Sequence, residues 1–174
     1  CNIDRIKETD PSMTEMQYKH WKSQGLCMKA YALYQMSLIW GDIPVQNSIP
    51  PAITAENVEE VYFEYYPPRT SKDDVYAQLI EELTWAAENG PDVNPSNKYL
   101  LSKAFARGML AKVYAEKSAH QDWNKVAEHC EIVEGMGFTL CDDYGQMWAY
   151  DDNDAVRNTS ESIFEVTWTR DQGN

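Results

Sequence analysis

The stretch that decides the fold is KAYALYQMSLIW (Lys29–Trp40), which is followed directly by GDIP (Gly41–Pro44). Apolar residues recur in and just before it at helical spacing on two faces. The sequence therefore predicts a helix that is buried between neighbouring helices. The two faces carry Leu26, Ala30, Leu33, Ser37 and Trp40 on one side, and Cys27, Tyr31, Tyr34 and Leu38 on the other. Gly41 permits a left-handed exit from this helix, and Pro44 prevents its continuation.

The beginning of this first helix is expected near Ser12, because Ser12-x-x-Glu15 resembles a capping box. Gly25 lies in the middle of the helix, where glycine lowers helix stability and permits a break. The helix is followed by a long, proline-rich connection that spans residues 41–70. A connection of this length in a compact domain is usually functional or part of an interface.

Three further helices are predicted downstream of the connection. The second helix begins at Thr70 or Ser71 and ends at Asn89, because Gly90-Pro91 is a strong stop signal. The third begins near Ser102, and the fourth spans residues 122–134. The third and fourth helices are joined by a short turn, which predicts an antiparallel hairpin like that of a tetratricopeptide (TPR) unit.

Residues 161–168 alternate between apolar and polar side chains, which predicts a half-buried strand. The sequence ends at Asn174, with no second strand after it to pair with this one. The predicted fold class is thus mainly α: TPR-like antiparallel helical hairpins with long loops and a short C-terminal strand. We expect residues 1–174 to form a single TPR-like region that is part of a longer protein.

The composition narrows the classes of ligand. The 174 residues carry 28 acidic and 15 basic side chains, a formal net charge of −13. Nucleic acid is not expected as a partner, because binding to its backbone needs clustered Lys and Arg. Anionic lipid would repel the same surface, and no apolar run is long enough to cross a bilayer. Neutral ligands such as sugars or peptides suit this composition better.

Motifs for catalysis or cofactor binding are scarce in the sequence. The acidic pairs 81–82 and 142–143 lack a spacing that would predict glycosidase carboxylates, and no GxSxG or phosphate-binding glycine loop is present. The run 151–154 (DDND) does not fit an EF-hand, although a calcium loop of another kind is left open. We therefore expect no enzyme activity, no cofactor and no metal site.

Aromatic residues are the best candidates for ligand contact, since the chain has 11 Tyr, 6 Trp and 4 Phe. Sugars are bound by aromatic rings together with side chains that form hydrogen bonds to hydroxyl groups. The candidate ligand-binding residues are Tyr62, Tyr65 and Tyr66 in the long connection, and Trp148 and Tyr150 near the acidic run. Other aromatic residues lie on apolar stripes and are predicted to be in the core: Trp40, Tyr76, Tyr114 and Trp123.

The order and spacing of several motifs resemble the SusD/RagB family of Bacteroidetes. The family's first signature, Arg-Ala-x-x-Tyr-x-x-Leu and then aromatic-Gly-Asp-aliphatic-Pro, is matched by Lys29-Ala30, Met36 and Trp40–Pro44. Further signatures are matched by Arg69, Ser71, Val75, Tyr76, Glu82, Leu83 and Ala86, by residues 102–114, by Trp123–Ala127, by residues 137–140 and by residues 161–166. Two lysines, Lys29 and Lys112, replace family arginines that look structural.

The resemblance implies an outer-membrane, surface-exposed lipoprotein that binds oligosaccharides or other small nutrients. Such proteins work with a TonB-dependent, SusC-like transporter in nutrient uptake, and they contact the membrane only through a lipid anchor. Family members are longer, and Cys1 lies too close to the first signature to be the lipidated residue. Two alternatives remain open from the residues: a TPR-like adaptor that binds a protein partner, and a carbohydrate-active enzyme.

Overall fold

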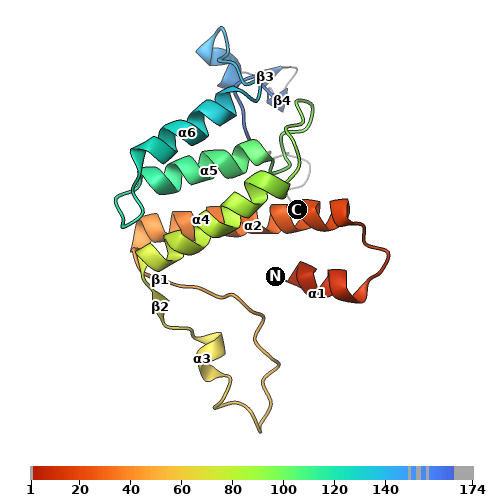
Figure 1. The fold of residues 1–174 in the computed structure, drawn as a ribbon, viewed down its shortest axis with the longest axis vertical. Helices are drawn as coiled ribbons and strands as arrows, with labels where there is room; N and C mark the ends of the chain where they lie inside the picture. Colours follow the sequence, from red (N-terminus) through yellow and green to blue (C-terminus); the bar gives the residue numbers. More distant parts are fainter. Residues whose placement is uncertain (1, 149, 152–153, 156, 167–174) are drawn as a thin grey trace.

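The computed structural model of the chain describes residues 2–148, 150–151, 154–155 and 157–166. Its elements are, in order, α1 (Asn2–Thr9), α2 (Glu15–Trp40), β1 (Ile43–Pro44), α3 (Tyr62–Tyr65), β2 (Arg69–Thr70), α4 (Lys72–Asn89), α5 (Lys103–Ala115), α6 (Trp123–Glu134), the 3-10 helix η1 (Tyr144–Trp148), β3 (Tyr150–Asp151) and β4 (Asp154–Ala155). The predicted mainly helical fold is confirmed. The helices α2, α4, α5 and α6 pack in sequence order, each against the next (Figure 1).

The predicted helix boundaries are close to those observed, with one correction at the first helix. The capping box is formed by Thr14 and Gln17, not by Ser12 and Glu15. Ser12 is instead held by Asp10, whose Oδ1 accepts hydrogen bonds from the Ser12 amide at 2.9 Å and from its hydroxyl at 2.6 Å. The helix then continues to Trp40 without a break at Gly25. The short helix α1 was not predicted.

The core lies where α4 packs between α2 and α5. On α4, the side chains of Tyr76, Leu79 and Leu83 are fully buried. The ring of Tyr76 stacks on Tyr34 of α2 with 6.2 Å between ring centroids, and its hydroxyl lies 3.3 Å from Ser37 Oγ. Tyr34 and Ser37 of α2 are thus buried, and the prediction that Tyr76 lies in the core is confirmed.

Several side chains that were predicted to be buried are exposed in the structure. Trp40 and Trp123 were predicted to be in the core, but they are 61% and 64% exposed. Tyr31 and Leu38, on the second apolar face of α2, are also exposed. The apolar pattern of a helix does not say whether a neighbour covers each face; α6, which carries Trp123, has α5 as its main helical neighbour in the described part of the chain. Tyr114 is half-buried.

The GDIP motif closes the base of the long connection. Ile43 pairs with Thr70 and Pro44 with Arg69 in the antiparallel ladder β1–β2. The Asp42 carboxylate accepts a hydrogen bond from the Lys72 amide at 2.9 Å, at the start of α4. These contacts hold the two ends of the connection together, and the part of it that carries α3 extends away from the helical layers (Figure 1).

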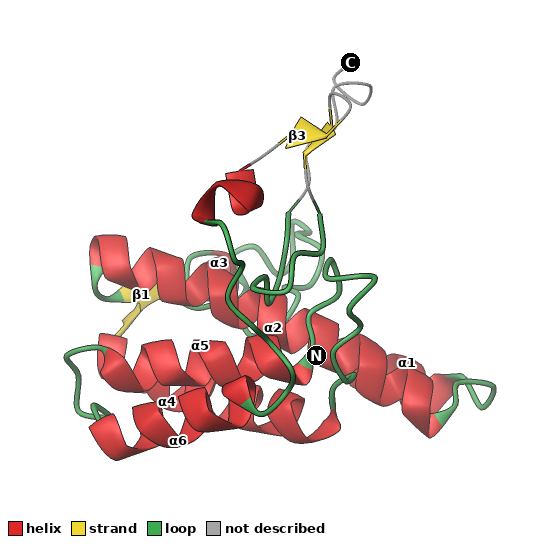
Figure 2. Ribbon diagram, turned by 90° about the horizontal axis from the view of Figure 1, so that it is seen from above, coloured by secondary structure: helices red, strands yellow, loops and turns green. Residues whose placement is uncertain are grey.

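The C-terminal segment corrects the strand prediction. Residues 161–166 are irregular and belong to no strand, and residues 167–168 lie outside the described part. The segment is held by the loop before α5, where the Glu165 amide donates to Lys98 O at 3.0 Å. Phe164 packs edge-on against Phe105. The short hairpin β3–β4 projects from the helical layers in both ribbon views (Figures 1 and 2).

His129, the buried residue of α6, is held in its neutral form. Arg107 of α5 lies 3.3 Å from His129 Nδ1, and a guanidinium can only donate, so Nδ1 accepts and the ring carries no second proton. Burial, with Arg107 as the next cause, lowers the pKa of His129 below its ordinary value of 6.5.

We predict that the free energy of unfolding decreases as the pH falls below about 6.5, because the unfolded chain then binds a proton that the folded chain does not. The variant His129→Gln should lose this part of the pH dependence. Urea denaturation at about pH 7.5 and about pH 5.5 measures it. An equal pH dependence in the variant and the wild type would contradict the prediction.

Candidate functional site

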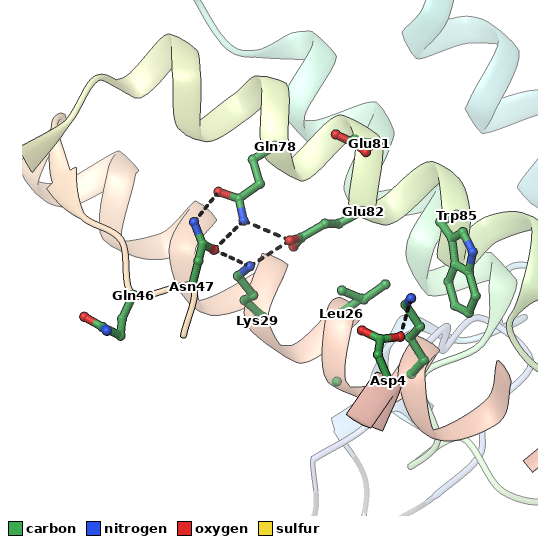
Figure 3. A pocket seen from close by; sticks show the side chains of 11 residues that line it. Asp4, Leu26, Lys29, Gln46, Asn47, Gln78, Glu81, Glu82 and Trp85 are labelled. Atoms are coloured by element: carbon green, nitrogen blue, oxygen red, sulfur yellow. Dashed lines mark hydrogen bonds and ion pairs between the residues drawn. The ribbon is translucent and has the colours of Figure 1, made fainter. Parts of the chain in front are cut away.

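An open cleft lies between α2 and α4, and it is bordered by α1 and by the first residues after β1 (Figure 3). Its volume is about 570 Å³. The cleft combines a polar end and an aromatic end. Asn47 and Gln78 lie at the polar end with Lys29 and Glu82, and Trp85 lies at the other end with Asp4.

The polar end is a connected network of side chains (Figure 3). Lys29 Nζ donates to Glu82 Oε1 at 2.7 Å and to Asn47 Oδ1 at 2.9 Å. Gln78 Nε2 donates to the same two oxygens, each at 2.8 Å. The network connects α2, α4 and the long connection, so it holds the start of that connection against the helices. Glu82 Oε2 is buried and has no hydrogen-bond partner among the described residues.

The aromatic end is organised by an ion pair. Lys22 Nζ lies 2.8 Å from Asp4 Oδ1, which also accepts a hydrogen bond from the Tyr18 hydroxyl at 2.7 Å. The hydrogen bond from Lys22 holds the pKa of Asp4 at about 2, below its ordinary 3.8. The same ammonium group lies 4.9 Å from the centre of the half-buried Trp85 ring. These contacts attach α1 to α2 at the edge of the cleft.

The tyrosines that were predicted from the sequence gather on the long connection. Tyr62 and Tyr66 are 53% and 68% exposed, and their ring centroids are 5.1 Å apart. Phe63, which was not a candidate, lies 5.3 Å from Tyr62 and is exposed as well. We call Tyr62, Phe63 and Tyr66 the α3 aromatic cluster. Tyr65 has a different role, because its hydroxyl donates to Pro51 O at 2.8 Å and braces the connection.

The other two candidate residues, Trp148 and Tyr150, do not belong to this cluster. Trp148 is 68% exposed and lies near Tyr144, with 6.5 Å between ring centroids. Its element η1 precedes β3, which lies at the opposite end of the longest axis from α3 (Figure 1). The backbone of Tyr150 belongs to β3, and its side chain lies outside the described part. Trp148 therefore lies on a different surface from the α3 aromatic cluster.

Metal and membrane features were searched in the described residues. No group of three or more His, Cys, Asp or Glu side chains is placed to hold a metal ion in that part of the chain. The acidic run 151–154 includes residues 152–153, which lie outside it. Of the helices that the structure describes, none has the length and apolar character needed to cross a membrane.

A sequence match places this chain in a known family. Residues 2–115 match the SusD-like family, which is described as starch-binding and associating with the outer membrane. Since the match covers more than half of the chain, the protein belongs to the SusD-like family. No curated protein matches the sequence.

Solved structures share the fold at low sequence identity. One is a SusD superfamily protein from Bacteroides vulgatus, with a TM-score of 0.71 and 21% identity over 95% of this chain. Another is a SusD-like protein from Bacteroides fragilis, with a TM-score of 0.66 and 21% identity over 90% of this chain. The chain spans 32% and 29% of the length of these two proteins.

We predict that the ion pair at the polar end of the cleft stabilises the fold. In Lys29→Met, the carboxylate of Glu82, which is 18% exposed, loses its cationic partner, and the free energy of unfolding should fall by about 1–3 kcal/mol. Lys29→Arg should retain most of the stability. Urea denaturation measures both variants.

A matched control is the exposed pair Lys125–Glu128 of α6, whose side chains are 46% and 49% exposed. Lys125→Met should have little effect, since exposed ion pairs contribute little to stability. If Lys29→Met were as stable as this control, the assigned role of the ion pair would be wrong.

Proposed function

We propose that this protein binds neutral oligosaccharides at the bacterial surface and passes them on without chemical change. The observation that carries the proposal is the α3 aromatic cluster, three exposed rings on a connection whose base is fixed by β1–β2. The family description, starch-binding and associating with the outer membrane, supports the same class of ligand. The net charge of −13 favours neutral over anionic glycans.

The mechanism we propose is stacking on a braced surface. Aromatic rings offer a large, rigid contact area to the apolar face of a sugar ring. Tyr62 and Tyr66 have ring centroids only 5.1 Å apart, so one ligand can contact both, and the hydrogen bond from Tyr65 to Pro51 braces the backbone that carries them. A surface that is already ordered loses little conformational entropy when a ligand binds. Trp148 offers a second exposed ring at the far end of the molecule.

We predict that Tyr66→Ala weakens the binding of maltoheptaose about tenfold, because the variant removes one stacking partner. Tyr62→Ala should act in the same direction. Tyr99→Ala is the matched control, since Tyr99 is also exposed but lies between α4 and α5. Isothermal titration calorimetry on protein of native length measures the dissociation constants.

Other results would contradict the proposal. Failure of the wild type to bind any neutral glycan on an array, together with saturable binding of peptides, would favour a protein-interaction adaptor. Release of shorter sugars over time would favour a carbohydrate-active enzyme. An equal loss of affinity in Tyr66→Ala and Tyr99→Ala would show that the α3 aromatic cluster is not the binding surface.

We further propose that the protein is a lipid-anchored partner of a SusC-like, TonB-dependent transporter. The family's association with the outer membrane supports this assignment. An affinity-tagged copy of native length, extracted from outer membranes in mild detergent, is expected to carry such a transporter with it and to bear a covalently attached lipid on a cysteine other than Cys1. Recovery without a transporter would contradict the partnership, and recovery from the soluble fraction would contradict the anchor.

A further inference from the structure

Gly25 lies at a place in α2 where the helix itself does not call for glycine. It is in the interior of a helix of 26 residues, where glycine is less stable than alanine. A Cβ built on Gly25 would meet no atom within 4 Å. By contrast, a Cβ on Gly90 would lie 2.4 Å from Ser23 Oγ and 2.6 Å from Ala86 O. Packing thus explains Gly90 but not Gly25.

The open space beside Gly25 belongs to the cleft between α2 and α4. Gly25 lines the cleft together with Leu26 and Trp85, which provide apolar surface. Any side chain at this position would reduce the volume of about 570 Å³, which falls within the range of about 300–1,000 Å³ of small-molecule sites. The effect of glycine at this position is therefore a wider cleft.

The polar groups of the cleft suit a ligand with many hydroxyl groups. Lysine ammonium groups donate, carboxylates accept, and the carboxamides of Gln46, Asn47 and Gln78 do both. A sugar hydroxyl both donates and accepts, so it can use either kind of partner. Two lysines face three acidic residues around the cleft, a balance that does not favour an anionic ligand.

The walls of the cleft are held in place by contacts among their own side chains. Lys29, Gln78 and Glu82 hold one another through hydrogen bonds of 2.7–2.8 Å. At the other end, the Asp4–Lys22 ion pair holds the ammonium group over Trp85. A ligand would therefore meet groups whose side-chain entropy has already been lost, which favours binding.

We propose that this cleft is a second subsite for neutral oligosaccharides, separate from the α3 aromatic cluster. It binds the end or a branch of the oligosaccharide. The inference rests on the proposed function, because it assigns a further contact surface to the same class of ligand. Gly25 is the residue that makes room for the sugar, and the side chains of Gln46, Gln78 and Trp85 contact it.

The test compares two glycines that are both in helices and both have open space. Gly25→Ala and Gly108→Ala should each raise the free energy of unfolding, because a Cβ at Gly108 also meets nothing within 4 Å. With maltoheptaose as the probe, Gly25→Ala should weaken binding about threefold and Gly25→Gln about tenfold or more. Gly108→Ala should bind like the wild type. A gain in stability together with a loss of affinity is a result that misfolding cannot produce.

The outcomes separate the cleft from the proposed function. If Tyr66→Ala weakens binding while Gly25→Ala and Gly25→Gln bind like the wild type, the protein binds glycans but the cleft is not a subsite. If Gly108→Ala loses as much affinity as Gly25→Ala, the effect is not specific to the cleft and the inference is overturned. If the wild type binds neither maltoheptaose nor any other neutral glycan, the proposed function fails, and the subsite with it.

Discussion

The burial of α4 on two sides is the constraint on which the other elements depend. Tyr76, Leu79 and Leu83 are inaccessible to solvent, so α2 and α5 must both lie against this helix. Burying a large apolar side chain stabilises a protein by about 1.5–3 kcal/mol. The packing of α4 against α2 and against α5 is therefore a main source of stability. The Lys29–Glu82 ion pair then fixes how α2 and α4 align at the cleft. Because Asn47 joins the same network, the position of the long connection follows from the packing of the helices.

The sequence predicted most helices well because their end signals are local. Ser71 caps α4 as expected, α6 begins directly after its cap Asp122, and Gly41 ends α2. The error at the start of α2 is instructive, because both Ser12-x-x-Glu15 and Thr14-x-x-Gln17 fit the capping-box pattern. Asp10 decides between them by binding Ser12, and such a competition is settled only when the backbone positions are known.

The surfaces were harder to predict than the helices. A run of aromatics in a long connection was enough to place Tyr62 and Tyr66 on the surface, and the structure brings their rings together. The exposure of Trp40 and Trp123 could not be read from their apolar stripes, since a stripe does not say whether a neighbour is present. The cleft could not be read at all, because its residues come from four segments between Asp4 and Trp85 that have no common spacing. Gly25 stood out in the sequence only as a residue that lowers helix stability, and not as part of a cleft.

The ladder β1–β2 has a consequence for how the connection can vary. The two strands, the Asp42–Lys72 contact and the hydrogen bonds of Asn47 fasten only its ends, while α3 lies away from the helical layers. Lengthening a loop with fixed ends costs little free energy, about 0.6 kcal/mol for each doubling of its length. The α3 segment can therefore change in length and sequence at little cost to stability, while the four stacked helices keep their packing.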